Sequence, residues 1–151
     1  MIVRDPEIYD EDFYSWALKQ AQLLREGRLS EIDIENIAEE LEDMGKSRAR
    51  ALESQLARLL AHLLKWQYQP DQRQRYENSW HASIRHARRE VERTLKENPG
   101  LKPHLPELFE EAYQDGVDWA IRETNLPESV FPIECPWTLE QVLEGDFWPD
   151  T

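Results

Sequence analysis

LESQLARLLAHLLKW, residues 52–66, is the stretch that decides the fold. Its apolar residues recur at intervals of three and four, which is the spacing of one face of an α-helix. They are Leu52, Leu56, Leu59, Leu60, Leu63 and Trp66. The letters QYQP follow, and Pro70 ends the pattern because proline lacks the N–H that a continuing helix needs. The stretch therefore predicts a long amphipathic helix that stops before Pro70.

Two more helices are predicted ahead of this stretch. The first begins at Asp10 and ends at Gly27, because aspartate is a favoured N-cap and glycine readily adopts the left-handed conformation that ends a helix. The second follows Ser30 and Asp33, which resemble a capping box with Asp in place of the usual Glu. Gly45 either ends this second helix or bends it, and the sequence leaves both alternatives open.

Two further helices are predicted after the stretch. The polar residues 70–78 are expected to form a connection. Trp80 then begins the apolar spacing of a basic helix, which ends at the Asn-Pro-Gly turn of residues 98–100. The next helix covers residues 105–120, and Asn125 beyond it is suited to a left-handed cap.

The C-terminal tail is rich in proline and is predicted to be irregular apart from one short helix. Thr138 and Gln141 make a capping box at the start of this helix, which extends to Leu143 and is closed by Gly145. No segment alternates like a β-strand, and no repeat or linker divides the chain. The sequence therefore predicts one all-α domain over residues 1–151, a bundle of about five main helices followed by this tail.

The composition is that of a folded domain. The chain has 151 residues, of which 40% are hydrophobic and six are Trp, so it is long enough to bury roughly 70% of its unfolded surface. The start, MIVRDPEIYD, lacks the pattern of a signal peptide, and no run approaches the ~18 apolar residues of a membrane span. One cysteine, Cys135, excludes an internal disulfide. These features predict a cytoplasmic protein without a membrane segment.

The net charge of −13 is unevenly distributed along the chain. Residues 1–47 hold 5 basic and 13 acidic side chains, residues 48–97 hold 11 and 6, and residues 98–151 hold 2 and 12. Overall acidity repels phosphate groups and argues against nucleic acid or an anionic membrane as a partner. The basic middle is expected to pack between the acidic ends and neutralise them.

The acidic stretch IENIAEELEDMG raises the question of a functional site. On a helical wheel, at about 100° per residue, Glu35, Glu39 and Glu42 share one flank of the apolar face. Glu39 and Glu42 could hold a divalent metal with His62 and activate water for phosphoester hydrolysis. The Glu-x-x-His pair of di-iron bundles is missing, however, and no cofactor is expected. The favoured interpretation is a salt-bridged face, with Arg88 paired to Glu39 or Glu42 and His62 a hydrogen-bonded boundary residue.

A role in RNA binding is a further alternative. Arg75 and His81 in RYENSWH have a spacing similar to that of all-α HEPN ribonucleases, with Tyr76 where those enzymes usually place a polar residue. Lys65 and Trp66 lie near other aromatic and basic residues that could stack bases. Aromatic residues at helix ends more often cover a hydrophobic core, and we favour that interpretation.

Several motifs in this order resemble the bacterial Domain of Unknown Function 29 family. They are YDEDFYSWALKQAQLLREG, DIENIAEELEDMG, HLLKWQYQP, the pair Ser79-Trp80, ENPGL, ETNLP and DFWP, and they span nearly the whole chain. The resemblance implies a small, cytoplasmic, helical protein with no defined activity. The residues that it places within these motifs are Asp33, Glu35, Glu39, Glu40, Glu42, His62, Lys65, Trp66 and Trp80. The chain departs from the family at Gly100 and Asn125, where Ser and Gly are expected, and both changes suit turns.

These patterns favour binding of a protein partner over catalysis. The candidate site residues are Asp33, Glu35, Glu39, Glu42, His62, Lys65, Trp66, Trp80 and Arg88. We expect a regulatory or accessory protein that uses the acidic helix face as its contact surface. A metal-dependent hydrolase and an RNA-binding or ribonuclease-like protein are the alternatives, and a homo-oligomer stays open.

Overall fold

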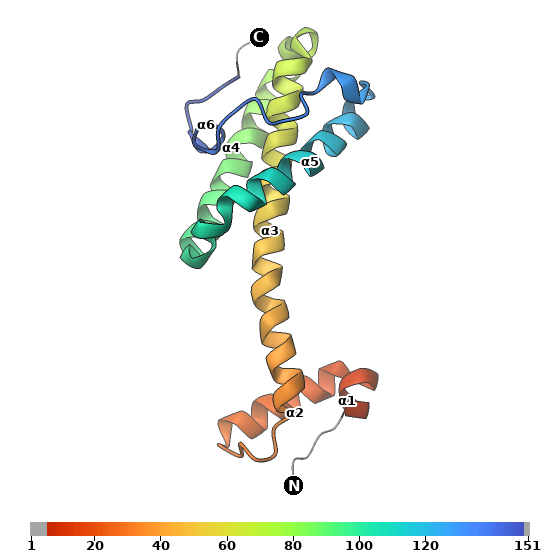
Figure 1. The fold of residues 1–151 in the computed structure, drawn as a ribbon, viewed down its shortest axis with the longest axis vertical. Helices are drawn as coiled ribbons and strands as arrows, with labels where there is room; N and C mark the ends of the chain where they lie inside the picture. Colours follow the sequence, from red (N-terminus) through yellow and green to blue (C-terminus); the bar gives the residue numbers. More distant parts are fainter. Residues whose placement is uncertain (1–5, 150–151) are drawn as a thin grey trace. The chain divides into compact units, whose positions relative to one another are not determined.

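The computed structural model describes residues 6–149, and their fold is all-α, as predicted (Figure 1). No strand is present in this part of the chain. The elements in order are α1 (Pro6–Glu11), α2 (Phe13–Arg25), α3 (Ile34–Tyr68), η1 (Pro70–Gln72), α4 (Arg73–Glu97), η2 (Pro99–His104), α5 (Leu105–Thr124), η3 (Glu128–Val130) and α6 (Leu139–Leu143), where η marks a 3₁₀-helix. Between residues 6 and 149 no helix is both long enough and apolar enough to cross a membrane.

The chain divides into two compact units, which we describe separately. Unit 1 extends to Ser47 and unit 2 begins at Arg48, so that α3 contributes residues to both. Whether the two units form the one domain expected from the sequence stays a prediction.

Unit 1 contains α1, α2 and the first part of α3. The N-cap of α2 is Asp12, whose carboxylate accepts the N–H of Ser15, and the expected cap at Asp10 is wrong because Asp10 lies within α1, a helix that the periodicity did not predict. Gly27 has a φ of +71°, which confirms the predicted left-handed residue after α2. The Trp16 ring is buried and meets the Tyr9 ring edge-on at 4.7 Å.

Gly45 does not end a helix, because α3 continues through it as one helix of 35 residues. The two helices that were expected on either side of Gly45 are therefore a single element. The described residues contain six α-helices, four of them long, in keeping with the all-α bundle of about five main helices that the sequence predicts.

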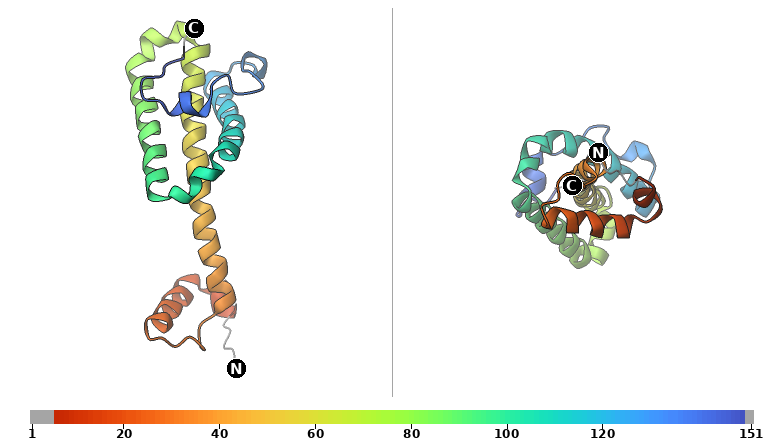
Figure 2. Two further views of the ribbon diagram at one scale, coloured as in Figure 1. Left: turned by 60° about the vertical axis from the view of Figure 1, so that its left-hand side comes forward. Right: turned by 90° about the horizontal axis from the view of Figure 1, so that it is seen from below.

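Unit 2 is built on the stretch quoted first. Figure 2 shows α4 and α5 on two sides of this part of α3, and in Figure 1 α5 crosses α3 at an angle. Its leucines are fully buried, and each contributes roughly 1.5–3 kcal/mol to folding. Gly116 brings α5 against α3 so closely that an added Cβ would lie 3.1 Å from the Ala57 carbonyl oxygen and 3.1 Å from the Leu60 Cβ. The contact requires glycine at this position.

The later elements correct one prediction and confirm two. The expected polar connection over residues 70–78 is wrong, because α4 already begins at Arg73 after the turn of η1. Asn125 is left-handed, with a φ of +59°, and caps α5 as predicted. Thr138 and Gln141 form the predicted capping box of α6, which ends at Leu143 without a left-handed Gly145. The tail returns to the core, where it buries Phe131, Trp137 and Val142.

Candidate functional site

Asp33 is a structural centre of unit 1. Its side chain is 1% exposed, accepts the Trp16 indole N–H at 3.1 Å and the Asn36 side-chain N–H at 2.7 Å, and caps the start of α3 through the Asn36 backbone N–H at 3.5 Å. Its own backbone N–H donates to the Gln20 side chain at 2.7 Å. The N-cap of this helix is therefore Asp33, and the expected cap at Ser30 is wrong. The Asp33 carboxylate therefore has a structural role, because it accepts hydrogen bonds from Trp16 and Asn36.

Glu35, Glu39 and Glu42 are all exposed and form what we call the acidic flank. They lie about 80° to 140° around the helix from Ile34. None of them makes a hydrogen bond or ion pair with a described residue. The neighbouring Glu40 differs, because it accepts the Tyr9 hydroxyl, and this hydrogen bond, with desolvation and nearby carboxylates, raises the pKa of Tyr9 to about 12. The acidic flank itself is open to a partner.

Beside the acidic flank lies an exposed apolar stripe, Ile34, Ala38, Leu41 and Met44. These residues fall within about 80° of Ile34 on the helical wheel; Ala38 lies on the side next to the acidic flank, and Leu41 and Met44 lie on the side away from it. Ile34 is 55% exposed, Leu41 62% and Met44 65%, although all three have the spacing of a core face. The inner side of this part of α3 is held against α1 and α2 instead, through Asp33 and Glu40. Unit 1 thus leaves the apolar stripe uncovered.

The outer face of α2 is also apolar and exposed. Tyr14 and Leu18 are each more than half exposed, whereas Trp16 and Leu23 on the opposite face are buried, and the half-exposed Phe13 packs beside Trp16 with ring centroids 5.6 Å apart. This helix therefore carries apolar residues on both sides, and only one side has a partner in the described structure.

His62 and Lys65 lie on the last turns of α3, next to Glu123 of α5. The His62 ring nitrogen Nδ1 lies 2.8 Å from the Arg58 carbonyl oxygen, and Lys65 forms an ion pair with Glu123. Burial lowers the pKa of His62, and the charges of Lys65 and Arg58 act in the same direction. Burial alone would raise the pKa of Glu123, but hydrogen bonds from Lys65 and Trp119 lower it. His62 is therefore a partly buried, hydrogen-bonded histidine, as the favoured interpretation expected.

Trp66 and Trp80 belong to an aromatic cluster that holds the end of the tail. The Trp66 ring lies 6.4 Å from that of Trp80 and 5.3 Å from that of Trp148, and its indole N–H donates to the Pro149 carbonyl at 3.1 Å. His81 stacks on Trp66 at 4.8 Å and lies 4.0 Å from Trp148. These rings cover a core, and His81 of the ribonuclease alternative is half-buried against two of them.

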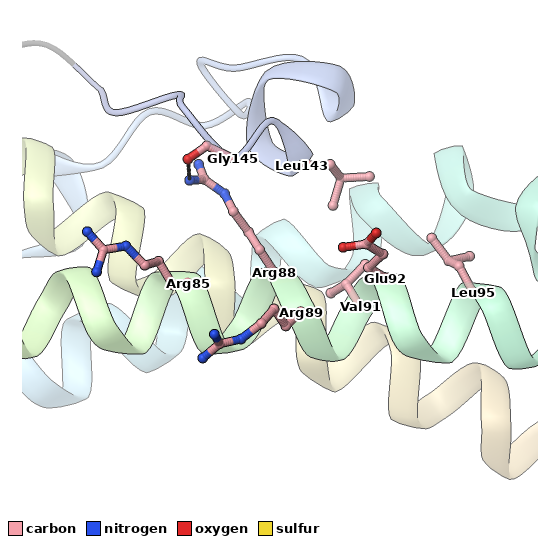
Figure 3. A pocket seen from close by; sticks show the side chains of 8 residues that line it. All are labelled: Arg85, Arg88, Arg89, Val91, Glu92, Leu95, Leu143 and Gly145. Atoms are coloured by element: carbon pink, nitrogen blue, oxygen red, sulfur yellow. Dashed lines mark hydrogen bonds between the residues drawn. The ribbon is translucent and has the colours of Figure 1, made fainter.

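Arg88 is the main link between α4 and the tail. Its side chain is buried, and its Nε, Nη1 and Nη2 atoms donate to the carbonyls of Val142 at 2.9 Å, Gly145 at 3.2 Å and Phe147 at 2.7 Å. Figure 3 shows the bond to Gly145. Its guanidinium also lies 5.5 Å from the centre of the Trp148 ring. Burial lowers the pKa of Arg88, while nearby carboxylates of the tail oppose this shift. These carbonyls take the place of the ion pair that was expected with Glu39 or Glu42.

The metal ligands proposed from the sequence are Glu39, Glu42 and His62. Glu39 and Glu42 belong to unit 1 and His62 to unit 2. Among the residues that the structure describes, no group of three or more His, Cys, Asp or Glu side chains could hold a metal ion. The hydrolase alternative therefore has no assembled centre in this part of the chain.

Two features of the site escaped the sequence reasoning. Glu123 was noticed only within the ETNLP motif, although its spacing from Trp119, which donates to it at 2.5 Å, is the i to i+4 spacing of a helix face. The sequence does not indicate that the apolar stripe is exposed, because the spacing of its apolar residues is the same as on a face that another helix covers.

Comparison with known proteins places the chain in a family. A family model described as "Domain of unknown function DUF29" matches residues 8–148. No curated protein and no solved structure matches the chain.

Proposed function

Because the chain belongs to the DUF29 family, whose description names no activity, we propose a function from its geometry: it is a protein-binding module whose contact surface is the apolar stripe with its acidic flank. The observation that carries this proposal is the exposure of Ile34, Leu41 and Met44 along one face of a well-formed helix. Contiguous apolar patches on a protein surface commonly mark interaction sites.

The arrangement has the anatomy of an interface. Apolar side chains occupy its centre and carboxylates its edge, which is the usual pattern of a hydrophobic core with a polar rim. The surface that complements it is an amphipathic helix with an apolar face and basic edges, since opposite charges accelerate association and select the partner. We place the protein in the cytoplasm, in keeping with its single cysteine, and assign it no cofactor.

The test compares two leucines of equal exposure. Leu41 is 62% exposed on the apolar stripe, and Leu29 is 61% exposed in the loop before α3. The tagged chain, Leu41→Gln and Leu29→Gln are expressed in the native host, and the proteins that co-purify after ribonuclease treatment are quantified. Loss of one buried leucine weakens binding by about 10- to 100-fold, so we expect Leu41→Gln alone to lose the partner.

A second comparison concerns the acidic flank. The triple variant Glu35→Lys, Glu39→Lys, Glu42→Lys should recover less of the partner than the unchanged protein does. The difference should grow as the salt concentration is reduced, because the introduced lysines then repel the basic edges of the partner at longer range. Equal recovery with Leu41→Gln and with Leu29→Gln would refute the proposed surface. Loss of the partner after ribonuclease treatment would point to RNA instead of protein.

A further inference from the structure

Unit 2 contains a cavity that is lined by both arginines and apolar side chains. It has a volume of about 320 Å³ and lies between α4 and the tail (Figure 3). Its main lining residues are Arg85, Arg88, Arg89, Val91, Leu95 and Leu143. We call it the Arg88 cavity. The arginines occupy one side in Figure 3, and the three apolar residues occupy the other.

The arginines that line the Arg88 cavity form no direct ion pair within the part of the chain that the structure describes. The three hydrogen bonds of Arg88 all go to neutral carbonyls, so they satisfy donors without supplying a counter-charge. Arg85 and Arg89 are exposed, and none of the three arginines forms an ion pair with a described residue. A guanidinium has five N–H groups, so two N–H groups of Arg88 remain beyond its three hydrogen bonds.

The apolar side offers a surface for a short hydrocarbon chain. Val91 is buried, and Leu95 and Leu143 are partly buried, so that the cavity has an apolar wall next to its charged end. Ligand cavities typically combine an apolar lining with a few polar groups that orient the ligand, and a volume of 320 Å³ is at the small end of their range.

From this juxtaposition we propose that the Arg88 cavity binds a small amphiphilic carboxylate, with the carboxylate at the arginines and the apolar chain against Val91, Leu95 and Leu143. Guanidinium groups match the planar geometry of a carboxylate, which explains the choice of anion. A simple anion such as acetate would leave the apolar wall uncovered, and a neutral alcohol would leave the arginines without a counter-charge.

Among residues 6–149, Glu92 is the one carboxylate that lines the Arg88 cavity, and its side chain points into the same space in Figure 3. It competes with an anionic ligand for the arginines. Glu144 and Asp146 of the tail also act on the charge of Arg88, but they do not line the cavity. Removal of the Glu92 charge should therefore strengthen binding, which is the opposite of what loss of an ordinary contact does.

The test uses octanoate, octan-1-ol and acetate as probes of the full chain. Amide resonances are followed by NMR during titration of each probe below its aggregation limit. We expect octanoate to shift the amides of Leu143 and Gly145 and to bind at least about fivefold more tightly than the other two probes. Octan-1-ol binding as tightly as octanoate, or shifts confined to other residues, would overturn the proposal.

Variants identify the groups responsible and leave the tail's anchor Arg88 intact. The double variant Arg85→Gln, Arg89→Gln should weaken octanoate about fivefold or more and leave octan-1-ol unchanged, whereas Arg93→Gln, an exposed arginine of α4 outside the lining, should change neither. Glu92→Gln should tighten octanoate by about two- to fivefold. Unchanged octanoate affinity in the double variant, or weaker binding in Glu92→Gln, would contradict the assigned site.

Discussion

Replacement of Arg88 by methionine should release the C-terminal tail from α4. Methionine keeps most of the apolar stem but removes the donors to Val142, Gly145 and Phe147. The Val142 carbonyl is buried and would stay unpaired, at a cost of about 1–3 kcal/mol, while the two partly exposed carbonyls can bond to water and cost about 0.5–1 kcal/mol each. Relief from burying a charged guanidinium offsets part of this loss. The expected decrease in the free energy of unfolding is about 2–4 kcal/mol.

Urea denaturation, followed by circular dichroism and by tryptophan fluorescence, measures this difference. Arg89→Met is the matched control, because Arg89 is the next residue of α4 and is exposed, and it should change the free energy of unfolding by less than about 0.5 kcal/mol. Limited proteolysis should cut the tail of Arg88→Met earlier than that of the control. Equal stability of the two variants would refute the view that Arg88 holds the tail.

Three further predictions concern single positions. Gly116→Ala should lose about 1–3 kcal/mol in urea denaturation, because its Cβ would meet backbone and side-chain atoms of α3, whereas Gly45→Ala, with no atom near the new Cβ, should gain about 0.5–1 kcal/mol. Asp33→Ala should lower the free energy of unfolding by about 2–4 kcal/mol, because it removes the cap of α3 and leaves the Trp16 indole unpaired. The control Glu35→Ala should lower it by less than about 0.5 kcal/mol. Equal effects of the two changes would contradict the assignment of Asp33. His62 has a lowered pKa in the folded state, so the unfolded chain binds its proton more readily, and stability should fall as pH drops below about 6.5; His62→Gln should remove that part of the slope between pH 7.5 and 5.5.

Local signals predicted the parts of the fold that local chemistry decides. Asn125 is left-handed and Thr138 pairs with Gln141 because each depends only on neighbouring backbone groups. The sequence could not decide whether Gly45 ends a helix, because a glycine inside a helix costs only about 1 kcal/mol and the helical turns on either side can compensate for that cost. The first turns of α4, from Arg73, were missed because a polar helix segment lacks apolar periodicity.

Long-range contacts explain why the candidate site was only partly predictable. The partners of Arg88 lie 54 to 59 residues further along the chain, and nothing near Arg88 in the sequence indicates carbonyl acceptors in place of a carboxylate. Periodicity identified the face that contains Leu41, but periodicity does not reveal whether another helix covers that face. The acidic flank is exposed, as charged residues usually are, but it makes none of the ion pairs with described residues that a salt-bridged face required.

The most direct test of the binding surface is photo-crosslinking in the native host from two positions on the same turn of α3. A benzophenone side chain is introduced at Leu41, on the apolar stripe, or at Asp43, which is exposed and lies about 160° away around the helix. We predict a discrete protein adduct from position 41 and none from position 43. No adduct from position 41, or the same adducts from both positions, would contradict the assignment of the apolar stripe as the surface that binds a partner.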